Sequence, residues 1–290
     1  MGNRVLPFRC SNGKVKLFTC KIVLLNMRTL YIFILSILFT ASVSMGQTAL
    51  PYLKEPTFKE GEKLTYKLKY GFMSAATGVL SVSKSNLKFS ANDAFHLNAV
   101  GETSGAFSVF YTVKNKYDSY IDGDTYLPHL YTEDIREGSY TRKEYATFDH
   151  RNRSVKGRKG TFKTPVLQTF DLLSAYYFAR NLDLSTLKKG DAFKISYFLN
   201  DEVEQLGITY EGIEKIKTSL GTVECIKFSP EIKPGRIFKK NSKLYLWVTN
   251  DGNRIPVRAH VEILIGSVTM ELTDAKGLKY ELGKKVSYSK

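Results

Sequence analysis

Residues 170–182 read Phe-Asp-Leu-Leu-Ser-Ala-Tyr-Tyr-Phe-Ala-Arg-Asn-Leu, and the interpretation of the whole chain depends on this stretch. It predicts a helix, because Asp171 or Thr169 can cap the start and Arg180 lies in the last turn, where the helix dipole favours a cation. Apolar residues cover more than one side of this helix, which is typical of a helix packed on several sides. We therefore expect one buried central helix near 170–182.

Alternating patterns on both sides of this helix predict β-strands. Residues 64–72 alternate Leu, Tyr and Phe with Thr, Lys and Gly, and residues 257–265 repeat the same period of two. Turn signals separate many short runs of this kind, and one such run, at 109–120, is predicted to be a single strand. The alternation of strands and helices that parallel sheets need does not occur. The sequence therefore predicts a mainly β fold, a large antiparallel meander curled into a barrel, a half-barrel or a sandwich.

The beginning of the chain has the pattern of a secretory signal. Residues 30–39 form an apolar run that follows a basic region and precedes small residues. Ser44 and Gly46 suit the positions before a cleavage site, which places the cleavage before Gln47. A retained membrane anchor is the alternative, but a bilayer span needs about 20 apolar residues. We therefore expect residues 1–46 to be an N-terminal extension with a cleaved signal.

The remaining residues, 47–290, are predicted to form a single β-rich domain, since no linker or repeat divides them. Residues 1–46 hold six of the 43 Lys and Arg residues and none of the 28 Asp and Glu residues, so residues 47–290 carry 37 − 28 = +9. This balance fits a protein that works near an anionic envelope surface. The basic runs at 151–159 and 233–243 are interpreted as solvated hairpin tips, and no nucleic-acid partner is expected in view of the export signal.

The positions of the cysteines limit which thiol chemistry and which membrane anchor the protein can have. Cys225 is the one cysteine of residues 47–290, and its strand-like surroundings predict a buried, inert thiol. No cysteine closely follows the apolar run, so a lipid anchor of the bacterial lipoprotein kind is not expected. We predict an exported protein, periplasmic or extracellular, that is not lipid-anchored and has no transmembrane segment after signal cleavage.

The sequence contains no motif for catalysis or for phosphate binding. Its four histidines show no pair at metal-ligand spacing, and no nucleophile elbow or phosphate-binding Gly-rich loop occurs. We therefore expect no enzymatic activity, no cofactor and no metal. Asp122 and Asp124 are interpreted as parts of a hairpin turn. The alternative is a glycan hydrolase that uses carboxylates such as Asp118 and Glu133.

Four stretches, taken in order, resemble a known family. They are Phe58-Lys59-Glu60-Gly61-Glu62-Lys63-Leu64-Thr65-Tyr66, the segment 118–128, the helix 171–180 followed by Lys189-Gly190-Asp191, and the segment 253–268 with Asn253-Arg254-Ile255-Pro256-Val257. In order and spacing they are similar to the bacterial domain of unknown function 3108 family. The resemblance implies an exported, β-rich envelope protein, and it implies no activity or catalytic residues.

The predicted architecture and the export signal favour a non-enzymatic envelope protein whose curled sheet binds an apolar or amphiphilic molecule, such as a lipid, or an envelope protein. Arg254 is expected to fix a turn with an acid such as Asp251, or to present its guanidinium to an anionic ligand. The alternative is a structural or assembly factor that pairs through exposed sheet edges. Aromatic residues are candidates for lining the binding site, namely Tyr66, Tyr70, Phe72, Tyr176, Tyr177 and Trp247.

Overall fold

The structure is a computed structural model that describes residues 49–89, 93–105, 107–232 and 242–287. The chain from Gln47 to Lys290 forms one compact unit. The predicted secretory signal within residues 1–46 and most of the basic run at 233–243 lie outside the described residues. No helix in the described ranges is both long enough and apolar enough to cross a bilayer.

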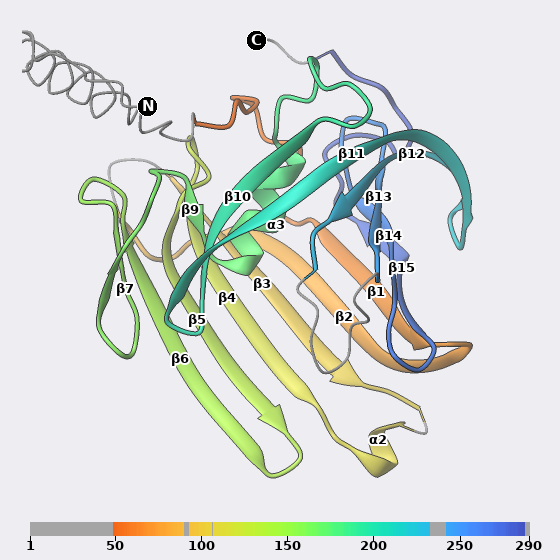
Figure 1. Cartoon of the computed structure of the whole chain (residues 1–290), viewed down its shortest axis with the longest axis horizontal. Helices are drawn as coiled ribbons and strands as arrows, with labels where there is room; N and C mark the ends of the chain where they lie inside the picture. Colours follow the sequence, from red (N-terminus) through yellow and green to blue (C-terminus); the bar gives the residue numbers. More distant parts are fainter. Residues whose placement is uncertain (1–48, 90–92, 106, 233–241, 288–290) are drawn as a thin grey trace, which may run out of the picture. The chain divides into compact units, whose positions relative to one another are not determined.

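Fifteen strands and two helices make up the described part of this unit (Figure 1). The helices are α2 (Phe107–Phe110) and α3 (Leu172–Arg180). The strands are β1 (Lys63–Tyr70), β2 (Met73–Lys84), β3 (Ala94–Thr103), β4 (Lys114–Asp122), β5 (Pro128–Glu137), β6 (Tyr140–Asp149), β7 (Ser154–Lys156), β8 (Thr161–Lys163), β9 (Thr169–Phe170), β10 (Ala192–Leu199), β11 (Glu202–Thr218), β12 (Gly221–Pro230), β13 (Leu244–Thr249), β14 (Pro256–Glu262) and β15 (Ser267–Lys276).

All fifteen strands belong to one sheet with the order β8-β7-β6-β5-β4-β3-β2-β1-β15-β14-β13-β12-β11-β10-β9. Neighbours in sequence are therefore neighbours in the sheet, except β8 and β9, and the pairing of β1 with β15 joins the first and last strands. Every pair is antiparallel except β9 with β10, which is parallel. This arrangement confirms the predicted antiparallel meander. The sheet is not closed by backbone pairing, because β8 and β9 form its two edges.

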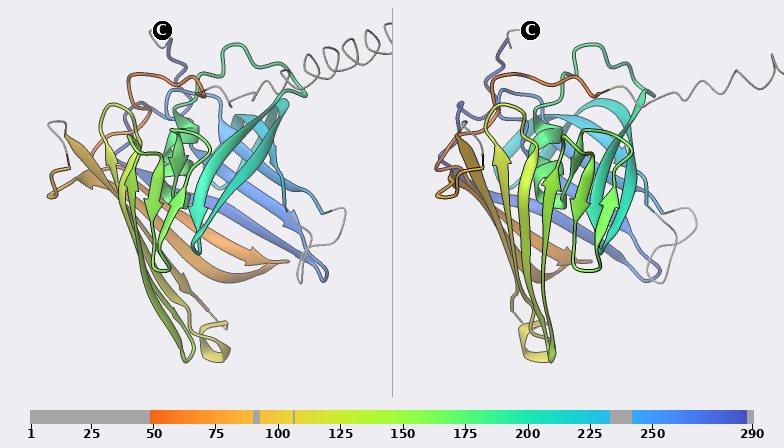
Figure 2. Two further views of the ribbon diagram at one scale, coloured as in Figure 1. Left: turned by 60° about the vertical axis from the view of Figure 1, so that its left-hand side comes forward. Right: turned by 90° about the vertical axis from the view of Figure 1, so that its left-hand side faces the viewer.

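The sheet curls around α3, which contacts β3, β4, β9 and β10 (Figure 2). Alternate residues of the strands point toward the helix, as the period of two requires. Val82, Leu97 and Ile121 belong to the same buried cluster as Tyr177 and Phe178 of α3. The predicted central helix is therefore confirmed as a buried element, and the curled sheet corresponds to the half-barrel among the predicted alternatives.

Side chains join the two ends of the sheet where backbone hydrogen bonds do not. Phe198 of β10 lies 6.4 Å from Phe148 of β6 and 5.5 Å from Phe162 of β8, measured between ring centroids. The backbone N–H of Lys159 donates to the Asp201 carboxylate over 3.3 Å. We call this line of contacts the side-chain seam.

The short helix α2 differs from the sequence-based expectation, which treated residues 109–120 as one strand. In the structure the chain forms a single helical turn over Phe107–Phe110, and β4 begins only at Lys114. Gly105 precedes this turn with a φ of 61°, a conformation that favours glycine. The apolar residues of this stretch therefore occupy a turn between β3 and β4 and do not alternate along a strand.

Candidate functional site

The N-terminus of α3 is held by Asp171, one of the two predicted caps. Its Oδ1 atom accepts hydrogen bonds from the backbone N–H groups of Leu173 (2.8 Å) and Ser174 (2.9 Å), and the Ser174 hydroxyl accepts one from the Asp171 backbone N–H (3.0 Å). The other carboxylate oxygen accepts from the Ser119 hydroxyl of β4 over 2.7 Å. Burial raises the pKa of Asp171, although these donors oppose the rise. The cap therefore also ties the helix to the sheet.

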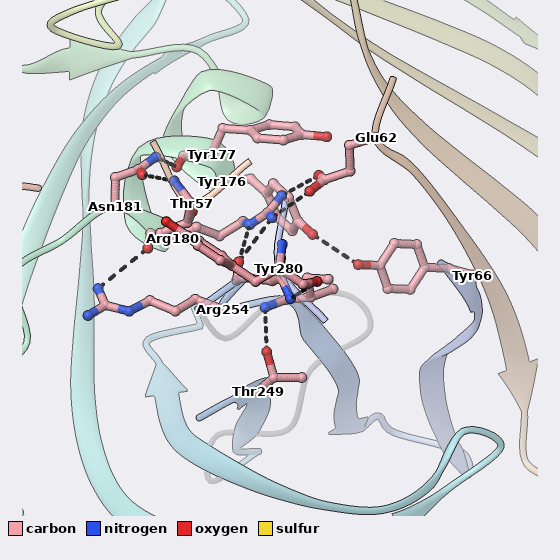
Figure 3. A network of polar contacts seen from close by, with 12 residues as sticks. Thr57, Glu62, Tyr66, Tyr176, Tyr177, Arg180, Asn181, Thr249, Arg254 and Tyr280 are labelled. Atoms are coloured by element: carbon pink, nitrogen blue, oxygen red, sulfur yellow. Dashed lines mark hydrogen bonds and ion pairs between the residues drawn. The ribbon is translucent and has the colours of Figure 1, made fainter. Parts of the chain in front are cut away.

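The C-terminus of α3 is held by a buried ion pair (Figure 3). The Arg180 guanidinium donates to both oxygens of Glu62, over 2.6 and 2.8 Å, and to the Asn253 carbonyl over 3.0 and 3.2 Å. Burial alone would lower the pKa of Arg180, but the Glu62 carboxylate raises it above its ordinary value. The helix is thus fixed both to the residue before β1 and to the turn before β14.

The four stretches that carry the family resemblance meet around this helix. Ser119 belongs to the second stretch, and it bonds to Asp171 of the third. Glu62 of the first stretch and Asn253 of the fourth both bond to Arg180. The motifs therefore coincide with the contacts that hold α3 in place.

An apolar cavity of about 370 Å³ lies between α3 and the sheet formed by β10–β13. Alternate residues of β10 point into it, and α3 contributes small side chains that leave the space open. We call it the helix cavity. The apolar part of its lining consists mainly of Ala175, Ala179, Ile195, Leu206, Leu246 and Val248. The polar part consists of Tyr176, Tyr197, Arg180 and Arg254.

The polar groups at the helix cavity are engaged by the protein itself. The hydroxyls of Tyr176 and Tyr66 lie 2.9 Å apart, and burial raises the pKa of Tyr176 to about 12. The Tyr197 hydroxyl donates to Glu204 over 2.5 Å, and the Arg254 guanidinium donates to the Leu182 carbonyl. What the cavity offers a guest is therefore mostly hydrocarbon surface.

A second cavity, of about 450 Å³, adjoins the first. The two share Phe228 and Arg254 in their linings. Lys54 and Asp183 are among the charged residues of the second cavity, which is thus more polar in character. Arg254 stands at the boundary between an apolar space and a charged one.

The structure brings only some of the predicted lining residues together. Tyr176 and Arg254 line the helix cavity, and Tyr66 reaches it through its hydrogen bond to Tyr176. Tyr177 points to the other side of α3, where its ring centroid lies 4.9 Å from that of Phe58.

The other three predicted residues lie away from the helix cavity. Leu246 and Val248 line the cavity, so the intervening Trp247 faces the opposite side of β13, in a cluster with Cys225. Tyr70 lies at the end of β1 and donates to the Ile265 carbonyl over 2.9 Å, and Phe72 is 92% exposed in the following turn.

The turn before β14 shows how Arg254 is placed. The backbone N–H groups of Asn253 and Arg254 donate to Asp251 Oδ1, over 2.9 and 3.0 Å. Asp251 therefore fixes the turn through the backbone of Arg254, and the guanidinium is directed to the end of α3. The φ of Arg254 is 49°, a conformation that non-glycine residues seldom adopt.

Sequence reasoning missed Glu62 and most of the apolar lining. The alternation of Phe193, Ile195 and Tyr197 marks one face of β10, and this signal could have been used. Glu62 gave no such signal, because its partner Arg180 is 118 positions away.

The carboxylates proposed for a hydrolase do not form a pair. Tyr117 pairs with Glu133, and Asp118 pairs with Thr132 across β4 and β5. Since paired residues share a face and successive residues alternate, Asp118 and Glu133 lie on opposite faces of the sheet. They cannot flank one glycosidic bond.

The remaining candidates for chemistry have structural partners. Asp122 Oδ1 accepts from the backbone N–H groups of Asp124 and Thr125, which makes this stretch the predicted turn. Cys225 is buried, and burial raises the pKa of its thiol to about 12. Among the described residues, no group of three or more His, Cys, Asp or Glu side chains could hold a metal ion.

Comparisons with known proteins identify a family and several distant folds. The family described as "Protein of unknown function (DUF3108)" matches residues 65–273, and no curated protein matches the chain. This match confirms the family resemblance found in the sequence. A beta-barrel-like protein of the domain of unknown function DUF1849 from Brucella abortus is 11% identical with a TM-score of 0.47, covering 80% of this chain and 100% of its own.

Two further solved structures are similar. A Bacteroides fragilis protein with a YmcC-like fold, described as exported, is 11% identical with a TM-score of 0.38 over 78% of this chain and 99% of its own. A DUF1089 family protein from Pseudomonas aeruginosa is 13% identical with a TM-score of 0.35 over 65% and 90%. At such identities and TM-scores these likenesses support no conclusion about what this chain does.

Proposed function

The chain belongs to the DUF3108 family of proteins of unknown function, and from this premise we propose that it is an exported envelope protein that holds an apolar or amphiphilic molecule in the helix cavity. The single observation that carries the proposal is that cavity of about 370 Å³ beside α3. Its volume lies within the range of roughly 300–1,000 Å³ that is typical of ligand sites.

The chemistry of the walls supports an apolar guest. Alanines of α3 and branched side chains of β10, β11 and β13 provide carbon surface. Because Tyr176 and Tyr197 already make hydrogen bonds within the protein, a guest that needs many polar contacts would not be satisfied there. An alkyl or acyl chain needs none. Arg254, at the boundary with the more polar cavity, is placed to meet the polar end of an amphiphile.

Export rests on the pattern of residues 1–46, in which a basic region, an apolar run and small residues follow one another. A location in the periplasm or outside the cell would bring the protein to lipids and other amphiphiles of the envelope. The proposal assigns the protein no catalytic step.

The test is to identify and then displace the guest. Native mass spectrometry of protein purified from its own cells, followed by solvent extraction, is expected to release an amphiphile. A fluorescent fatty acid should then bind the emptied protein. Ala179→Phe fills the helix cavity and should weaken this binding at least about tenfold, because the displaced guest loses its apolar contacts.

Ala192→Phe is the matched control, because Ala192 is exposed at the start of β10 and outside the cavity lining. It should bind the probe like the unmodified protein. Absence of any bound molecule together with equal probe binding by both variants would contradict the proposal.

A second candidate function is assembly through a sheet edge. β6 begins at Tyr140, but it pairs with β7 only at Thr147–Asp149 in the described part of the chain. The stretch 140–146 therefore offers one edge to a strand of another protein. A photo-crosslinking residue at Tyr145 should capture one protein in intact cells if this edge is used; a failure to capture any would argue against it.

A further inference from the structure

One end of the sheet carries large apolar side chains that are exposed to solvent. They lie in the β1–β2 turn, in α2 and in the β14–β15 turn (Figure 1). Phe72 is 92% exposed, Phe110 86% and Ile265 78%, where a large apolar side chain is ordinarily covered. We call this set the apolar rim, and it consists of Phe72, Met73, Val109, Phe110, Leu264 and Ile265.

Backbone contacts place these turns at the same end of the sheet. The Gly71 N–H donates to the Ser267 carbonyl over 2.9 Å, which joins the β1–β2 turn to the β14–β15 turn. The Ser104 N–H donates to the Ala75 carbonyl over 3.0 Å, which places the end of β3, before α2, beside the start of β2. The rim is thus assembled from segments that are far apart in the sequence.

The rim segments are free of charge, although 24% of the chain is Asp, Glu, Lys or Arg. No charged residue occurs between Lys69 and Lys84, between Glu102 and Lys114, or between Glu262 and Glu271. Most of the first charges beyond the tips form ion pairs within the protein. Lys69 pairs with Glu271 over 2.5 Å, and Lys114 pairs with Glu102 over 3.4 Å.

Tyrosines border the rim. Tyr111 follows α2 and is 51% exposed, and Tyr140 begins β6 and is 53% exposed. Tyr70 precedes Phe72 and bonds to the carbonyl of Ile265. A tyrosine has an apolar ring and a polar hydroxyl, and this combination suits the boundary between hydrocarbon and water.

We propose that the apolar rim docks onto the surface of a phospholipid bilayer and inserts its side chains among the lipids. An exposed apolar patch marks either a protein or a membrane contact. The three rim segments carry no charge, whereas a protein interface is ordinarily surrounded by a polar rim, and this difference favours a membrane. Burial of several such side chains in the acyl boundary is the usual basis of interfacial membrane binding.

The inner face of the sheet continues from the rim to the helix cavity. Leu246 lines the cavity and pairs with Ala259, which pairs with Met270, which pairs with Leu68. The next inward-facing row toward the rim consists of Leu244, Val261, Val268 and Tyr70. Docking at the rim would therefore bring a bilayer to the end of an apolar surface that leads to the cavity. The docking itself does not require an occupied cavity.

The test uses the compact unit 47–290 and vesicles of phosphatidylcholine, separated by sedimentation. The unmodified protein should bind the vesicles. A triple variant, Phe72→Asp, Phe110→Asp and Ile265→Asp, should lower the partition coefficient at least about tenfold, since each site loses the burial of a large apolar side chain. Because most of the flanking charges are paired and the rim itself is uncharged, binding should persist in 1 M salt, where the Debye length is about 3 Å.

Leu167→Asp is the matched control, because Leu167 is 50% exposed and precedes α3, outside the rim. It should bind within about twofold of the unmodified protein. An environment-sensitive dye on Phe110→Cys should shift to the blue when vesicles are added, and the same dye on Leu167→Cys should not.

Three results would overturn the proposal. They are no binding of the unmodified protein, full binding of the triple variant, and loss of binding in high salt. A fall in sedimentation coefficient of the triple variant without vesicles would instead assign the rim to a second copy of the chain. Ala179→Phe separates this proposal from that of the cavity, because it should bind vesicles normally.

Discussion

Arg180 at the end of α3 and Glu62 just before β1 form a bidentate ion pair, with hydrogen bonds of 2.6 and 2.8 Å. Their side chains are only 2% and 0% exposed. Removing two charges from water costs free energy, and two short hydrogen bonds with further donation to the Asn253 carbonyl offset that cost. The pair therefore fixes the helix relative to the sheet at the wall of the helix cavity.

Glu62→Gln should destabilise the protein by about 3–5 kcal/mol, because it leaves the Arg180 guanidinium buried without a counter-charge. Urea unfolding followed by circular dichroism measures the loss. Glu55→Gln is the control, since Glu55 is 58% exposed in its pair with Lys279 and should contribute little. The double variant Glu62→Leu with Arg180→Met should regain much of the lost stability, and equal losses in Glu62→Gln and Glu55→Gln would contradict the assigned role.

Asp171→Ala should cost about 2 kcal/mol, because it removes the helix cap and leaves the Ser119 hydroxyl without its acceptor. Hydrogen exchange should increase first in the initial turn of α3. Thr169→Ala is informative as a comparison, because Thr169 was the other predicted cap and its hydroxyl bonds to Val166 and Ser196 instead. Greater exchange in α3 for Thr169→Ala than for Asp171→Ala would contradict the assignment.

Protonation of the Asp118 carboxylate should make the protein less stable in acid. Burial opposes its ionisation, but hydrogen bonds from His96, Asn98 and Lys116 lower its pKa below the ordinary value of 3.8. Its folded-state pKa is thus depressed, so its contribution is present above about pH 3.8 and is lost as the pH falls through the folded-state pKa.

The measurement is urea unfolding of the unmodified protein and of Asp118→Asn between pH 7 and pH 3. The difference in stability between them should be largest at pH 7 and should shrink in the acid range. A difference that stays constant with pH would show that the carboxylate charge contributes nothing.

Cys225 should not react with a maleimide or a disulfide reagent in the folded protein at pH 8. Its thiol is fully buried, and its pKa of about 12 leaves almost no thiolate. In urea the thiol should react at once. Rapid labelling of the folded protein would mean that the strand pair β12–β13 opens readily at this position.

The strands and the central helix could be predicted from the sequence because their signals are local. The alternation in 64–72 and the cap at Asp171 depend only on neighbouring residues. The short helix α2 was missed, because a run of apolar residues that follows Gly105 is compatible with a strand as well as with a turn.

The candidate site was only partly predictable, because it depends on which face of each strand points inward. Trp247 and Leu246 are neighbours, and register alone decides that Leu246 lines the helix cavity. A β-bulge between Trp247 and Val248 shifts that register where β13 meets β14. The sequence analysis had named Trp247 as a lining residue because aromatic side chains often line binding sites.

The side-chain seam has a mechanical consequence. In a closed barrel, strand number and hydrogen-bond stagger together set the circumference. Here Phe198 rests against Phe148 and Phe162 with no ladder across the join. Contacts between aromatic rings can shift without breaking a backbone ladder, so we expect the width of this half-barrel to vary more readily than that of a closed barrel. A guest of the helix cavity, if bound as proposed, would then be accommodated at different widths without loss of a strand pairing.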